Sequence, residues 1–375
     1  MSVRKSTSPI LLVGGGADAT AVRYACGFTA TDPFLFLRAR GGDVLLVSIL
    51  ELGRALNVPG PVTCLTTKDL ALPKGKRSLG DQALALLRHQ GLKHVDVSPD
   101  CPVGLARTLE AGGVRVRVIP GNLFPERLKK SPAEIRALRE AQRTAVSAMA
   151  VAVGMIRDSR ILPGGGLERD GKALTSERVR AGIEMDLLQR NFVAEADIIV
   201  AGGDQAVDPH ERGHGPLFAG QTIVLDIFPR SRRTGYWGDI TRTVLRGKPS
   251  AEQRRLYRTV LTVQRAALAR VRPGVSGAEI HQEVAKSFEA AGYVTGMKDG
   301  VPQGFIHSTG HGVGLDIHEA PSVSPAGGPL ETGQVITIEP GLYYRGIGGV
   351  RIEDTVLVTE SGHSPLARAP KVFAL

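Results

Sequence analysis

The first 130 residues alternate short apolar runs with amphipathic segments. Strands are predicted at residues 9–13, 34–38, 44–49, 94–97 and 114–119, and helices at 17–25, 81–89 and 101–112. Strands that alternate with helices along the chain favour a layered α/β fold. The glycines at 14–16 lack both the spacing and the following lysine of a phosphate-binding loop, so they predict a plain turn.

The second part of the chain begins with a strong helix signal. Ser131 and Glu134 form a capping box around Pro132, and apolar residues follow at spacings of three and four. Further helices are predicted at 175–190, 250–270 and 276–292, and strands at 198–200, 222–228, 236–245, 304–308, 335–339 and 350–358. We therefore expect an α/β domain over residues 1–130 and an α+β domain, with helices around an antiparallel sheet, over residues 131–375.

Composition supports this organisation. A chain of 375 residues exceeds the usual size of a single hydrophobic core, and its 42% hydrophobic and 22% charged residues are typical of a soluble globular protein. No apolar run approaches the roughly 18 residues of a membrane span, and the run at 10–13 is too short for a secretory signal. A cytoplasmic protein without membrane contact is predicted. Three scattered cysteines, at 26, 64 and 101, fit neither a disulfide framework nor a zinc cluster.

The net charge of +10 raises the question of an anionic partner. Arginines are spread along the chain, and the densest cluster is Arg230, Arg232 and Arg233. Surfaces that bind single-stranded nucleic acid interleave basic with aromatic side chains, and only 5% of these residues are aromatic, so nucleic acid is not expected as a partner. We instead predict that the three arginines attract a smaller anionic group, such as the carboxylate of a substrate.

Two aspartates interrupt otherwise apolar or β-branched runs. Asp226 lies in the predicted strand 222–228 and Asp239 in the predicted strand 236–245, and these two strands could pair as a hairpin. Either carboxylate could face solvent, because a lone buried carboxylate is costly unless it is paired or binds a cation. Two together indicate a shared partner, for which a metal ion is the simplest choice.

Three further polar residues stand in strand-like settings. His311 is flanked by glycines, Glu339 lies between isoleucine and proline, and Glu353 lies in a segment of alternating character. With the two aspartates they offer four carboxylates and one imidazole, which suit two divalent ions with a bridging hydroxide. Oxygen-rich ligands with a single nitrogen suit Mn²⁺, Co²⁺ or Zn²⁺. A pair of such ions can polarise a carbonyl and activate water, so the set indicates hydrolytic chemistry.

The order and surroundings of these five residues resemble a known family. The segments Gly-Asp-Ile-Thr-Arg-Thr, His-Gly-Val-Gly-Leu-Asp-Ile-His-Glu, Ile-Glu-Pro-Gly-Leu-Tyr and Arg-Ile-Glu-Asp are similar to those of the pita-bread metallopeptidases. The likeness is strongest to the proline-specific branch, the Xaa-Pro dipeptidases (prolidases) and Xaa-Pro aminopeptidases. It covers residues 130–375 and is looser over 1–130. The resemblance implies a creatinase-like N-terminal domain followed by a pita-bread catalytic domain.

The resemblance also assigns roles. It makes Asp239 and Glu353 bridging ligands of a dinuclear centre whose full set is Asp226, Asp239, His311, Glu339 and Glu353. Glu339 would also take a proton from the attacking water, and His210 and His318 would assist at the scissile bond. A proline amide has no N–H to grip, so the pocket needs an apolar wall and a cation for the terminal carboxylate. The residues expected to bind the substrate are His307, Tyr343 and Arg351, and the resemblance equally allows Arg351 to support the network around the last glutamate.

The implied function is a metal-dependent Xaa-Pro dipeptidase with two ions, manganese being expected and cobalt or zinc possible alternatives. An Xaa-Pro aminopeptidase that acts on longer peptides is the nearest alternative. The compact N-terminal domain and the arginine-rich loop at 229–236 favour the dipeptidase. The complete ligand set disfavours a pseudoenzyme or binding protein and creatinase-like chemistry, and the N-terminal domain disfavours a methionine aminopeptidase. A homodimer is implied by the resemblance alone.

Overall fold

The chain divides into two compact units, Met1–Glu126 and Arg127–Leu375. The computed structural model describes residues 8–16, 18–72, 74–195 and 197–375. The first residue of the helix expected at 17–25 lies outside these ranges. The domain boundary expected after residue 130 stays a prediction.

The N-terminal unit is built on one six-stranded sheet of order β4-β3-β2-β1-β5-β6. The pairs β1–β2 and β2–β3 are antiparallel, whereas β3–β4, β1–β5 and β5–β6 are parallel. A mixed sheet of this kind confirms the predicted α/β class. Its strands are β1 (Ile10–Gly14), β2 (Phe34–Ala39), β3 (Gly42–Leu46), β4 (Val62–Leu65), β5 (His94–Val97) and β6 (Arg115–Val118).

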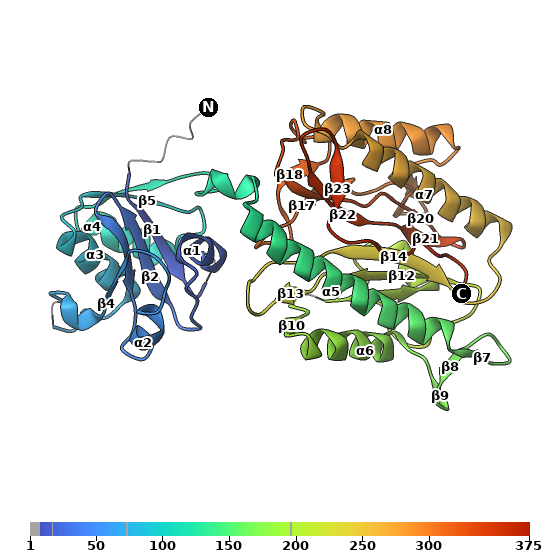
Figure 1. The fold of residues 1–375 in the computed structure, drawn as a ribbon, viewed down its shortest axis with the longest axis horizontal. Coiled ribbons are helices and arrows are strands. Elements are labelled where there is room, and N and C mark those ends of the chain that lie inside the picture. Colours follow the sequence, from blue (N-terminus) through green and yellow to red (C-terminus); the bar gives the residue numbers. More distant parts are fainter. Residues whose placement is uncertain (1–7, 17, 73, 196) are drawn as a thin grey trace. The chain divides into compact units, whose positions relative to one another are not determined.

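Helices cover both faces of this sheet (Figure 1). Because side chains alternate along a strand, Leu11 and Val13 of β1 pack into the same cluster as Leu86 of α3, whereas Leu12 packs with Val22 of α1 on the other face. The helices are α1 (Ala19–Cys26), α2 (Leu52–Ala55), α3 (Leu79–His89) and α4 (Val103–Ala111), with short 3₁₀ turns η1 (Thr67–Asp69) and η2 (Pro125–Leu128).

The C-terminal unit contains two pairs of long helices. The pair α5 (Pro132–Arg157) and α6 (Ser176–Gln189) is followed by the pair α7 (Ala251–Arg270) and α8 (Gly277–Ala290). The predicted capping boxes at Ser131, Ser250 and Ser276 are all present, and each serine accepts a hydrogen bond from the third helical residue. No helix in the described ranges is both long and apolar enough to cross a membrane.

Two antiparallel sheets separate the helix pairs. One has the order β11-β12-β14 and the other β18-β17-β19-β22-β23. Their strands are β11 (Ile199–Gly202), β12 (Thr222–Ile227), β14 (Ile240–Leu245), β17 (Gly310–Gly312), β18 (Glu319–Val323), β19 (Val335–Ile338), β22 (Asp354–Val358) and β23 (His363–Pro365). Smaller pairings involve β7 (Arg160–Ile161), β8 (Leu167–Arg169), β9 (Lys172–Ala173), β10 (Phe192–Val193), β13 (Arg230–Ser231), β15 (Gly296–Lys298), β16 (Val301–Gln303), β20 (Gly341–Tyr344) and β21 (Gly348–Arg351), and η3 (Gly203–Val207) is a 3₁₀ turn.

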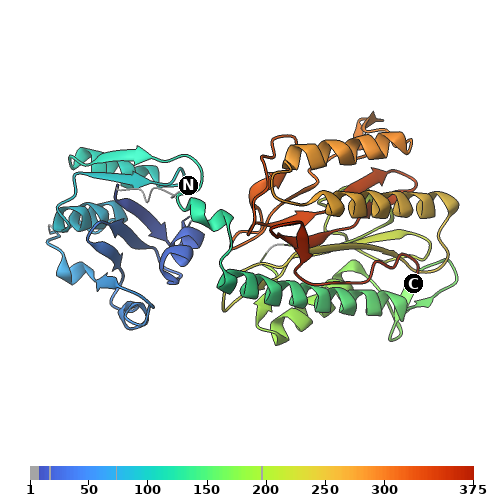
Figure 2. The same ribbon diagram turned by 45° about the horizontal axis from the view of Figure 1, so that its top comes forward.

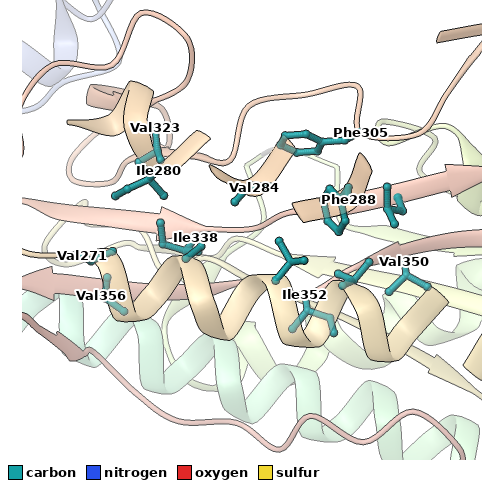
Figure 3. Close-up of a cluster of buried hydrophobic side chains, with 14 of the residues drawn as sticks. Val271, Ile280, Val284, Phe288, Phe305, Val323, Ile338, Val350, Ile352 and Val356 are labelled. Atoms are coloured by element: carbon teal, nitrogen blue, oxygen red, sulfur yellow. The ribbon is translucent and has the colours of Figure 1, made fainter. Parts of the chain in front are cut away.

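Each helix pair buries its apolar stripe against strands. Residues of α5 and α6 share a core with β11, β12 and β14, and residues of α7 and α8 share a core with β19, β21 and β22. The two pairs lie on opposite sides of the strands within this unit (Figures 1 and 2). Figure 3 shows Ile280, Val284 and Phe288 of α8 gathered with Ile338 and Val356 from the strands. The predicted α+β arrangement is confirmed.

Three predicted strands differ from the structure. Asp239 lies just before β14, because its backbone N–H and C=O bond to the Gln142 side chain. The segment 350–358 is split into β21 and β22, because the N–H of Glu353 turns to the carbonyl of Thr241. The segment 304–308 is not a strand; there, Gly304 makes only an isolated bridge to Tyr343.

Candidate metal centre

The five predicted ligands come from five segments of the C-terminal unit. Asp226 lies in β12, Asp239 directly before β14, His311 in β17, Glu339 directly after β19, and Glu353 between β21 and β22. The antiparallel pairing of β12 with β14 sets Ile227 opposite Ile240, which brings the two aspartates to the same end of the pair. Strand ends and interruptions therefore supply all the ligands but His311 and Asp226.

The structure gathers these side chains into one cluster. The Nε2 atom of His311 lies 3.2 Å from an oxygen of Glu339 and 3.5 Å from an oxygen of Asp239. Ligand atoms of Asp239, His311 and Glu353 all lie within 4.8 Å of one another. The Asp226 carboxylate is close enough to help raise the pKa values of Asp239 and Glu353. The structure therefore brings the five predicted ligands together, and their role in metal binding stays a prediction.

Two oxygens of the cluster are buried without a donor. Among the residues that the structure describes, Oδ1 of Asp226 and Oε1 of Glu353 accept no hydrogen bond, although Oε2 of Glu353 accepts one from Thr241 at 2.9 Å. An unpaired buried acceptor costs about 1–3 kcal/mol, and more when it is charged. A divalent cation would satisfy such atoms, and carboxylates with one imidazole form a suitable donor set. The residues present therefore fit a metal site.

The pKa values of the clustered acids reflect burial and the charges of their neighbours. Burial, reinforced by repulsion between the acids, raises the pKa values of Asp239 and Glu353 well above their usual range. Burial also disfavours the charged form of Glu339, but the hydrogen bond and positive charge of His311 outweigh it and lower its pKa to about 2. The pKa of His311 is raised, because Glu339 more than offsets the effect of burial.

The local sequence fixes the direction of His311. Its ring Nδ1 lies 3.1 Å from the carbonyl of Gly312, which leaves Nε2 for the carboxylates. The backbone N–H of His311 donates to Oγ1 of Thr337 at 3.0 Å. A Cβ on Gly310 would lie 2.0 Å from the carbonyl oxygen of Thr337, and one on Gly312 would lie 2.5 Å from that of Ala320. The flanking glycines thus allow β17 to approach its neighbours closely.

Arg351 is committed to the cluster. It is 3% exposed, donates to Oδ2 of Asp226 at 2.7 Å and donates to the hydroxyl of Tyr343 at 2.7 Å. The Tyr343 hydroxyl in turn lies 3.0 Å from Nε2 of His307, and Tyr343 is fully buried. This geometry favours a supporting role for Arg351 over capture of a substrate carboxylate, a choice that the sequence left open.

Three further histidines lie near the ligands. The ring of His318 stands edge-on to that of His311, with centroids 4.3 Å apart. Burial lowers the pKa of His307 to about 4, and partial burial together with His311 lowers that of His318. His210 lies on an exposed loop, and its electrostatic influence adds to the lowering of the pKa of both His307 and His318, so it lies near these two histidines.

Two arginines of the predicted anion-attracting cluster pair with acids of the chain. Arg230 forms an ion pair with Glu195 and lies 5.8 Å from the ring centroid of Trp237. Arg233 pairs with Glu140 of α5 at 2.6 Å. The predicted effect of these arginines on substrate binding stays a prediction. Their ion pairs with Glu195 and Glu140 tie the loop to other parts of the chain.

Several supporting residues escaped the sequence analysis. Thr241 donates to Glu353, Thr337 to Glu339 at 3.2 Å, and Thr355 to the carbonyl of Asp239 at 2.8 Å. All three are buried threonines on strands. In the sequence, each is a threonine near an acid in an otherwise apolar strand. Threonine is common in strands for its β propensity alone, so this pattern does not reveal a supporting role.

The buried acids and His311, held on strands or next to them between two helix pairs, form a site that fits metal-dependent hydrolytic chemistry. Residues 136–360, more than half of the chain, match the model described as metallopeptidase family M24. The chain belongs to this family, and this confirms the predicted family, fold class and enzyme class.

Individual proteins similar to this chain are also peptidases by name. An uncharacterized peptidase (YqhT) of Bacillus subtilis (strain 168) is 33% identical over 250 residues, which are 65% of this chain and 64% of that protein. An Xaa-Pro dipeptidase of Pyrococcus horikoshii is 31% identical over 288 residues, 75% of each chain. The solved structure of an Xaa-Pro dipeptidase from Bacillus anthracis superposes with a TM-score of 0.82 at 26% identity, covering 98% of this chain and 95% of that one. The match to the Bacillus subtilis peptidase spans less than two thirds of that protein's length.

Proposed function

We propose that the chain is a dinuclear-metal-dependent Xaa-Pro dipeptidase that hydrolyses the peptide bond preceding proline. The observation that carries the proposal is the buried cluster in which Asp226 and Glu353 each keep an oxygen without a donor from any residue that the structure describes. The naming of relatives as Xaa-Pro dipeptidases supports this substrate class. An Xaa-Pro aminopeptidase acting on longer peptides is the alternative that the experiment below tests.

The residues would divide the work as follows. Asp226, Asp239, His311, Glu339 and Glu353 would hold the ions, which when bound supply Lewis acidity and lower the pKa of a coordinated water. Glu339 would accept the proton, and its lowered pKa beside His311, which keeps the carboxylate ionised, supports this role. His318, whose pKa is lowered by partial burial, and His210, which lies on an exposed loop, would assist at the scissile bond. His307 would contribute to the wall of the proline pocket.

Manganese is our proposed metal, with cobalt or zinc as alternatives, because the donor set is rich in oxygen and has one nitrogen. Three free cysteines fit a reducing compartment, which supports the expected cytoplasmic location. A homodimer remains a proposal that rests on the family resemblance.

The experiment measures the rates at which metal-free and Mn²⁺-loaded enzyme hydrolyse three peptides. We expect Mn²⁺ to restore hydrolysis of Ala-Pro after chelation, with little turnover of Ala-Ala and slower turnover of Ala-Pro-Gly. Faster cleavage of the tripeptide would replace the dipeptidase with the aminopeptidase. No Mn²⁺ binding and no gain of activity would reject the metallopeptidase itself.

A further inference from the structure

Gln142 of α5 grips the main chain of one proposed ligand from outside the strands. Its side chain is buried, with 2% of the residue exposed. The amide Nε2 donates to the carbonyl oxygen of Asp239 at 2.7 Å, and Oε1 accepts from the N–H of Asp239 at 2.8 Å. A carboxamide that makes both bonds to one residue reproduces the pattern of a neighbouring strand.

The place of Asp239 in the sheet explains why such a grip is needed. Asp239 precedes β14, so the ladder to β12, which ends with Ile227 opposite Ile240, does not hold it. The hydroxyl of Thr355 donates a second hydrogen bond to the carbonyl of Asp239 at 2.8 Å. The backbone N–H of Asp239, however, donates to the side chain of Gln142. The Gln142 amide therefore completes the backbone bonding of this ligand.

The helix itself lies directly against this loop. A Cβ on Gly238 would be 2.5 Å from the carbonyl oxygen of Ala141, so only glycine permits the approach that brings Gln142 to Asp239. The long helix α5 is anchored by nine buried residues along its length. A fixed helix and a close contact leave Asp239 little freedom, and this matters for a carboxylate that must meet an ion at a defined distance.

We propose that Gln142 is a positioning residue that holds the Asp239 carboxylate in register with the other ligands and thereby sets the affinity for divalent metal. This inference rests on the proposed metal centre. Partners that orient ligands typically contribute 10- to 100-fold to metal affinity. Gln142 does so through the main chain of the ligand, which distinguishes it from Thr241, whose hydroxyl bonds the Glu353 carboxylate itself.

The test measures Mn²⁺ affinity of metal-free protein by isothermal titration calorimetry. Gln142→Met keeps the side-chain length and removes both bonds, and Gln142→Asn keeps the amide but withdraws it by one methylene. The matched control is Gln253→Met. Gln253 is likewise a buried helical glutamine, and its amide donates to the carbonyls of Gly220 at 2.9 Å and Ile347 at 3.3 Å, away from the ligands.

We expect both Gln142 variants to bind Mn²⁺ about tenfold more weakly or worse, while Gln253→Met keeps wild-type affinity even if its urea midpoint falls. Wild-type affinity in a folded Gln142 variant would overturn the proposal; if Gln142→Met does not fold, Gln142→Asn decides. A loss of affinity in the control equal to that of Gln142→Met would also overturn it, because general loosening would then be the cause. Failure of the wild type to bind Mn²⁺ would instead reject the metal centre.

Discussion

Replacing Glu353 with glutamine removes a buried carboxyl group at nearly constant size. Glu353 is 1% exposed, its Oε2 accepts from Thr241, and its Oε1 has no donor within the described ranges. Glutamine keeps the acceptor for Thr241 and can direct its amide toward the remaining carboxylates. Because an unpaired buried acceptor costs about 1–3 kcal/mol, we expect the metal-free variant to gain about that much in free energy of unfolding.

The same substitution should have the opposite effect on the metal-loaded protein. Glu353→Gln removes an anionic ligand, so Mn²⁺ affinity should fall by more than the roughly 10- to 100-fold typical of outer-shell changes. Wild type should therefore be the less stable protein in chelator and the more stable one in excess Mn²⁺, since binding to the native state stabilises it by mass action.

Urea unfolding followed by tryptophan fluorescence measures both effects. The chain has one tryptophan, Trp237, which is buried two positions before Asp239 and so reports on the catalytic unit. Glu331→Gln is the control, because its side chain is 53% exposed and pairs with Lys129; it should change stability by only about 0–1 kcal/mol. A metal-free Glu353→Gln that is less stable than wild type would refute the electrostatic reasoning.

Two further substitutions test the supports of the cluster. Arg351→Met should destabilise the catalytic unit by up to about 3–5 kcal/mol, because it leaves the partly buried Asp226 without its cation, and urea unfolding compared with the exposed-pair variant Arg160→Ala would detect this. A change no larger than that of Arg160→Ala would contradict the pairing. Gly310→Ala should displace His311 and weaken Mn²⁺ binding in calorimetry, since its Cβ meets a carbonyl at 2.0 Å, whereas Gly296→Ala, with open space around it, should not; equal affinities would reject the steric argument.

The sequence predicted what local chemistry determines. The capping boxes at Ser131, Ser250 and Ser276 predicted the starts of three helices, because a cap is decided within four residues. The five predicted ligands, four acids and one histidine, could be grouped because charged side chains in apolar strands need a common explanation. Their order along the chain resembles that of the pita-bread metallopeptidases, and their individual roles rest on this resemblance.

The remaining features depend on contacts between segments far apart in sequence. Nothing near Gln142 indicates that its amide faces Asp239, which lies 97 residues away. Arg351 could be read as a substrate-binding cation until its pairing with Asp226 was visible. Likewise, the split of 350–358 into two strands follows from a bond between Glu353 and Thr241, which no pattern within the segment specifies.

The charges inside the site bear on how many ions it takes. Arg351 balances Asp226, which leaves the carboxylates of Asp239, Glu339 and Glu353 without a permanent cation when His311 is neutral as a ligand. Two divalent ions with one bridging anion match three negative charges, whereas a single divalent ion leaves the buried site anionic. We therefore expect calorimetry to give two Mn²⁺ per wild-type chain. A stoichiometry of one at saturating metal would show that the charge balance is met in another way, with one of the buried acids protonated.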